Sequence, residues 1–159
     1  MSRVLAALIG CSLFAFDSLQ SQAAPAYAIT DVRVHLFYSN TATFSETLVG
    51  NPRIRALRNT PIGEGDAGAP SDATLVVVEV SGQPGSFAEG RKVELAVREQ
   101  NKETFRRSQR LGVLSGQGHS YVAFWLYDTG CSPLRISAAL LGQRNSSRRL
   151  IEVPFQCGE

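Results

Sequence analysis

The segment Lys92-Val93-Glu94-Leu95-Ala96-Val97-Arg98-Glu99 decides the fold class of this chain. Its apolar residues Val93, Leu95 and Val97 alternate with the charged residues Lys92, Glu94 and Arg98. A period of two is the pattern of a β-strand that has one face buried and the other face in water. The segment therefore predicts a sheet that covers a hydrophobic core on one side.

Other segments share this strand character through alternation or through runs of β-branched and aromatic residues. Five are strong: Asp31–Tyr38, Thr74–Val80, Tyr121–Tyr127, Leu134–Leu141 and Arg149–Gln156. Three are weaker candidates: Phe44–Val49, Arg53–Arg58 and Thr104–Leu114. The polar stretch Asn101–Arg110 would also suit one short helix, but we prefer a strand there. Glycine, proline and asparagine turns separate these segments.

Many short strands with no helices to cover a parallel sheet predict an all-β fold. We expect a single antiparallel two-sheet sandwich, with an immunoglobulin-like Greek key preferred over a closed barrel. Strand patterning alone is compatible with both arrangements.

The first 28 residues have the layout of a cleavable secretory signal peptide. Arg3 supplies a positive charge, Val4–Phe16 is an almost unbroken apolar run, and small residues follow. Both Gln22-Ala23-Ala24 and Ala26-Tyr27-Ala28 suit a signal peptidase, while the run is too short for a transmembrane anchor. We expect residues 1–28 to be removed, residues 29–159 to form one β-sandwich domain, and the protein to be periplasmic or secreted.

A lipid anchor at Cys11 is the alternative to simple cleavage. Leu8-Ile9-Gly10-Cys11 resembles the motif in which a cysteine becomes the lipidated first residue. Only ten residues precede Cys11, however, and the apolar run continues to Phe16. We therefore favour cleavage without lipidation.

Composition narrows the classes of partner. Apolar residues make up 43% and charged residues 19% of the chain, as in a globular domain, and the formal net charge is only +2. That charge does not favour nucleic acid as a partner. Gly63–Gly68 has the glycine spacing of a dinucleotide loop, but a strand rather than a helix is expected after it. We expect no cofactor.

Two features of the chain concern ligation and cross-linking. Glu64, Asp66 and Asp72 lie in a Gly/Pro-rich loop where they would suit calcium, although the spacing is poor and a solvated loop is the favoured interpretation. Cys131 and Cys157 would remain after export and predict a disulfide rather than a metal site. If the hairpin between the last two strands turns about Arg144, the two cysteines lie opposite each other.

The segment Tyr121–Tyr127 is the candidate binding strand. Alternation places Tyr121, Trp125 and Tyr127 on one face, where they would stack on a sugar ring or an extended peptide if that face meets solvent. A central strand with both faces covered is the commoner arrangement for such a doubly apolar segment, and we favour it on pattern alone.

Catalytic patterns are weak throughout. His119 has serines nearby at Ser115 and Ser120 and an acid at Asp128, but the segment does not spell a nucleophile elbow. We expect an exported, non-catalytic module that binds a protein, peptide or glycan. The alternative is a small secreted hydrolase that uses His119 with Ser115 or Ser120 and Asp128.

The disulfide prediction can be tested by thiol chemistry. A Cys131–Cys157 bond stabilises the fold by about 3.5 kcal/mol on the chain-entropy estimate, so Cys157→Ser is expected to lower thermal stability clearly. Thiol titration of the mature protein under denaturing, non-reducing conditions should find no free thiol. Two reactive thiols per mature chain would rule the bond out.

Overall fold

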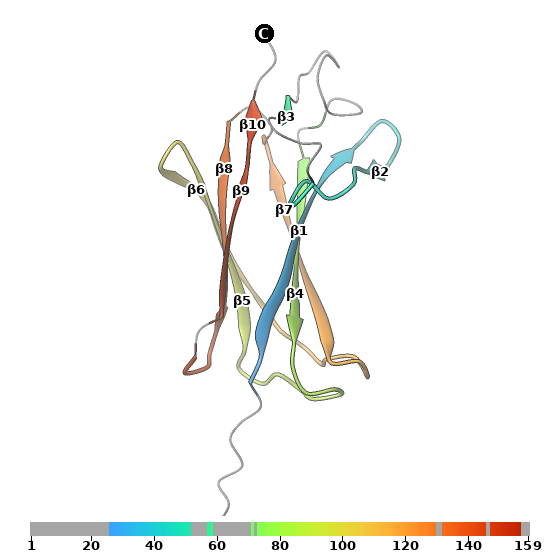
Figure 1. The fold of residues 1–159 in the computed structure, drawn as a ribbon, viewed down its shortest axis with the longest axis vertical. Coiled ribbons are helices and arrows are strands. Elements are labelled where there is room, and N and C mark those ends of the chain that lie inside the picture. The colour runs from blue at the N-terminus through green and yellow to red at the C-terminus, as the bar shows by residue number, and fades with distance from the viewer. Residues whose placement is uncertain are drawn as a thin grey trace, which may run out of the picture.

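The computed structural model of the chain describes residues 26–51, 57–58, 71, 73–129, 132–145 and 147–156. Within these residues the chain forms two four-stranded antiparallel sheets that pack face to face as a sandwich and do not close into a barrel (Figure 1). The predicted all-β class and two-sheet architecture are confirmed, and the closed barrel is wrong. None of the described residues belongs to a helix that is long and apolar enough to cross a membrane.

The first sheet has the strand order β2-β1-β4-β7. Its members are β2 (Thr43–Phe44), β1 (Ala28–Tyr38), β4 (Ala73–Ser81) and β7 (His119–Tyr127). The second sheet has the order β6-β5-β8-β9. It consists of β6 (Lys102–Arg110), β5 (Lys92–Glu99), β8 (Leu134–Leu141) and β9 (Arg148–Val153). Two short strands, β3 (Leu57–Arg58) and β10 (Phe155–Gln156), pair in parallel.

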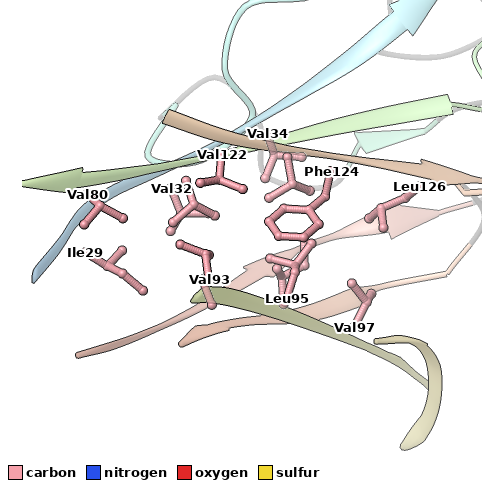
Figure 2. Packing of buried hydrophobic residues seen from close by; sticks show 14 of the residues in the cluster. Ile29, Val32, Val34, Val80, Val93, Leu95, Val97, Val122, Phe124 and Leu126 are labelled. Carbon is pink, nitrogen blue, oxygen red and sulfur yellow. The ribbon is translucent and has the colours of Figure 1, made fainter. Parts of the chain in front are cut away.

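The core lies between the two sheets and is built from the alternate residues that point inward. Figure 2 shows Phe124 from β7 packed against Leu95 from β5, with valines from both sheets beside them. Phe105 of β6 meets Phe124 edge-to-face, with ring centroids 6.5 Å apart. The one buried polar side chain among the described residues, Thr74, has its hydroxyl 2.6 Å from that of Thr129. Every strongly predicted strand contributes residues to this core.

The structure changes the bounds of several predicted strands. Pro154 divides Arg149–Gln156 into β9 and β10, because proline has no N–H for the ladder. Only Phe44 of the segment Phe44–Val49 lies in a strand, and β6 ends at Arg110 rather than Leu114. The stretch Asn101–Arg110 is not helical. Most of Arg53–Arg58 lies outside the described residues.

The register of the β8–β9 hairpin differs from the prediction by one residue. Ile136 lies opposite Ile151 and Leu134 opposite Val153, so the hairpin turns between Gln143 and Arg144 rather than at Arg144. This register does not place Cys131 opposite Cys157, and β9 ends at Val153. The geometric argument for the disulfide is therefore wrong. Both cysteines lie outside the described residues, and the bond itself stays a prediction.

The folded domain begins before the predicted boundary at residue 29. Ala28 pairs with Ser81, and Tyr27 before it is only 4% exposed. The Tyr27 N–H donates to Gln143 Oε1 (3.3 Å), and Gln143 Nε2 donates to the Tyr27 carbonyl (2.8 Å). Cleavage after Ala28 would remove this buried ring, whereas cleavage after Ala24 would keep it. If the leader is cut, the structure favours the earlier site.

Replacement of Tyr27 tests its place in the core. We expect Tyr27→Ala to lower the free energy of unfolding by about 3–5 kcal/mol, because a buried aromatic ring is lost. Tyr27→Phe removes only the hydroxyl contacts to Ser86 Oγ (3.2 Å) and the Phe87 carbonyl (3.4 Å), and should cost about 1 kcal/mol. Urea unfolding of both variants measures the difference. Equal, small losses would mean that the ring is not buried.

Candidate functional site

β7 buries one face and exposes the other. Val122, Phe124 and Leu126 point into the core, which directs the alternate residues outward. Among these, Tyr121 is 57%, Trp125 37% and Tyr127 69% exposed. The favoured prediction of a central strand with both faces covered is wrong, because β7 is the last strand of its sheet and its outer face meets solvent.

Four rings gather on this outer face at the end of the sheet where β7 finishes. We call Phe37, Phe44, Trp125 and Tyr127 the aromatic cluster. Ring centroids lie 5.2 Å apart for Phe37 and Phe44, 5.4 Å for Phe37 and Trp125, and 6.0 Å for Phe44 and Trp125. The rings of Trp125 and Tyr127 are nearly parallel, at 14° with centroids 6.5 Å apart. The cluster contains no charged side chain.

Strand register explains how residues distant in sequence meet there. Phe37 of β1 lies opposite Phe44 on one side and Ala73 on the other, and Ala73 is in turn opposite Tyr127. Ala73 lies between these larger side chains and is buried. Trp125 lies opposite Leu75 of β4, which presents an apolar side chain to the same face. Sequence analysis missed Phe37 and Phe44, although the alternation of β1 already placed Phe37 with the outward residues.

The other end of the same face is charged. The Arg33 guanidinium donates to Glu79 Oε2 of β4 at 3.0 Å, and His119 Nδ1 lies 2.9 Å from Glu79 Oε1. The hydroxyl of Thr30 donates to Glu79 Oε1 at 3.2 Å, and Arg33 Nε lies 3.2 Å from Asp31. These groups, Thr30, Asp31, Arg33, Glu79 and His119, are the Glu79 cluster.

Tyr121 belongs to this charged end. The Arg33 guanidinium lies over its ring at 5.4 Å from the centroid, a cation–π contact. The three predicted binding residues therefore divide between two environments. Trp125 and Tyr127 sit in the aromatic cluster, whereas Tyr121 packs against the Glu79 cluster.

The predicted hydrolase residues do not form one site, although Ser115 lies beside the backbone of His119. His119 begins β7 and Asp128 follows its last residue, so the strand separates them by roughly 30 Å. Alternation places Ser120 on the inner face, opposite to His119. The Ser115 hydroxyl accepts hydrogen bonds from the backbone amides of Gln117 (3.3 Å) and His119 (3.2 Å), a turn-stabilising role. Glu79, not Asp128, is the acid beside His119.

The predicted calcium ligands Glu64, Asp66 and Asp72 lie outside the described residues. Within the described part of the chain, His, Cys, Asp and Glu side chains do not gather in a group of three or more that would hold a metal ion. The aromatic cluster and the Glu79 cluster are thus the two chemical features of the exposed face.

Comparison with known proteins adds no family. Neither models of protein families nor curated protein sequences match this chain.

Loss of charge at Glu79 tests the charged end. Glu79 is half-buried and forms an ion pair with Arg33. Because Glu79→Gln removes the negative charge of this pair, we expect it to lower the free energy of unfolding by about 1–2 kcal/mol. Glu152→Gln is the matched control, because Glu152 is exposed and lies 3.9 Å from Arg135. That change should cost less than about 0.5 kcal/mol. Equal effects in chemical denaturation would show that the Glu79 contacts contribute nothing.

Proposed function

We propose that this chain is an exported, non-catalytic module that binds a partner through the outer face of the sheet β2-β1-β4-β7. The observation that carries the proposal is the aromatic cluster. Trp125, Tyr127 and Phe44 are exposed next to one another on a four-stranded sheet. Contiguous exposed aromatic surface is uncommon on a soluble domain and marks interaction sites.

The chemistry of the cluster favours a neutral partner with a flat apolar surface. Its four rings carry no charge, and Trp125 and Tyr127 hold nearly parallel planes. Such rings stack on the apolar face of a sugar ring or on the side chains of an extended peptide. The indole N–H and the Tyr127 hydroxyl supply polar contacts beside the apolar surface. A glycan, a peptide and a protein surface all present such groups, and we place the glycan first because it matches flat, neutral stacking.

The proposed scaffold is an immunoglobulin-like Greek key. The strand order supports this assignment, since β1, β4 and β7 share one sheet while β6, β5, β8 and β9 share the other. The chain crosses between sheets from β4 to β5 and again from β7 to β8, as the corresponding strands do in that fold. Sandwiches of this type host many unrelated functions, so the proposal depends on the surface and not on the scaffold.

Trp125 is the only tryptophan of the chain, so its fluorescence reports directly on the cluster. We expect titration with cellotetraose or chitotetraose to change its emission. The Trp125→Tyr variant should bind these sugars more weakly, and the Trp125→Ala variant should not bind them, as measured by calorimetry. Leu150→Ala is the control, because Leu150 is 68% exposed on the opposite sheet.

The same titration distinguishes the partner classes. If neither sugar changes the Trp125 emission but a neutral extended peptide does, the partner is a polypeptide. If none of these probes changes the Trp125 emission, the result would count against the aromatic cluster as a binding site. Labelling of Ser115 or Ser120 by a serine-reactive probe would instead favour the hydrolase.

A further inference from the structure

We propose that the free edge of β7 pairs antiparallel with β7 of a second copy of this chain, which joins two four-stranded sheets into one. The proposal concerns the backbone edge of β7, whereas the proposed partner binding concerns its outer face. Either can hold without the other.

The hydrogen-bonding phase of β7 identifies the backbone groups on its free edge. β4 occupies one side of β7, and no other strand of the described residues pairs with it. Gln109 of β6 donates its side-chain N–H to the Ala123 carbonyl at 2.7 Å. That carbonyl is therefore directed away from β4. Because direction alternates along a strand, Trp125 and Tyr127 present their N–H and C=O groups to the same free edge.

Among the described residues, neither a strand nor a side-chain hydrogen bond covers the edge where β7 finishes. Gln109 covers the Ala123 carbonyl in the middle of the strand, where β6 approaches β7. Beyond that point the β5–β6 hairpin diverges, and its tip lies apart from the end of β7 (Figure 1). Trp125 and Tyr127 lie in this open part.

Charge distinguishes β7 from the other edge strands. Residues Tyr121–Tyr127 contain no charged side chain. The other long edges carry several: Lys102, Glu103, Arg106, Arg107 and Arg110 on β6, and Arg148, Arg149 and Glu152 on β9. Natural sheets use charges and short strands to prevent edge-to-edge association. β2 pairs only with Phe37 and Tyr38 of β1, and the rest of the β1 edge carries Asp31 and Arg33. β7 is the long edge that lacks this protection.

A second copy of the chain is the partner that this edge fits. The excess of arginine on β6 and β9 would set like charges against each other if either strand paired with itself. β7 meets no such repulsion. Pairing about Leu126 sets Trp125 opposite Tyr127 of the second copy, and Tyr127 opposite its Trp125. Each pair exchanges edge hydrogen bonds and forms an aromatic cross-strand contact, while Gln109 stays in place.

Two variants of Tyr127 separate the contribution of its backbone N–H to dimerisation from the contribution of its ring. Tyr127→Ala and Tyr127→Pro both remove the ring, but only proline removes the edge N–H, which is not part of the ladder with β4. Sedimentation of the full chain, expressed with its own N-terminal segment, should show a dimer. We expect Tyr127→Pro to raise the dissociation constant at least about tenfold beyond Tyr127→Ala. Leu150→Ala should leave it unchanged.

Two results would overturn the proposal. One is a wild-type protein that sediments as a monomer at about 1 mM, where even weak contacts associate. The other is equal dissociation constants for the two Tyr127 variants. If Tyr127→Pro does not fold, hydrogen exchange of the wild type decides the question. The amides of Trp125 and Tyr127 should be protected at high protein concentration and exchange freely on dilution, and concentration-independent exchange would exclude edge pairing.

Discussion

The packing of Val122, Phe124 and Leu126 into the core is the constraint on which the surface of this protein depends. Successive side chains of a strand point to opposite faces, so burial of these three residues directs Tyr121, Trp125 and Tyr127 to solvent. A slip of one residue would bury the aromatic rings and expose Phe124. The contact between Phe124 and Phe105 of β6 holds the strand in this register from the opposite sheet. Core packing and surface chemistry therefore have one cause.

Much of the fold could be predicted from sequence because alternation is a local signal. In segments such as Lys92–Glu99, the alternation of apolar and charged residues predicts both the strand and its buried face. Register is less local, and the pairing of β8 with β9 differs by one residue from the predicted pairing. Position within a sheet is not local at all. The sequence of Tyr121–Tyr127 does not show that the segment lies at an edge, and its doubly apolar pattern predicts a covered central strand instead.

The candidate site shows the same limit. Alternation within one strand related Tyr121, Trp125 and Tyr127, but pairing across strands decides which of them share an environment. Phe37 and Phe44 join Trp125 through the β1–β2 and β1–β4–β7 ladders. Tyr121 instead forms a cation–π contact with Arg33, which is paired with Glu79. One face thus combines a neutral aromatic end with a charged end, and a partner that lies along β7 would meet both.

The outward orientation of Trp125 is tested most directly by acrylamide quenching of this single tryptophan in the folded protein. An outward-facing Trp125 is expected to be quenched readily and to emit at wavelengths typical of a partly hydrated indole, before any ligand is added. Phe44→Ala removes a ring that lies against Trp125 and should increase the quenching further. A blue-shifted emission that resists acrylamide in both proteins would show that Trp125 is buried, and would contradict the orientation of β7 on which the proposed binding face rests.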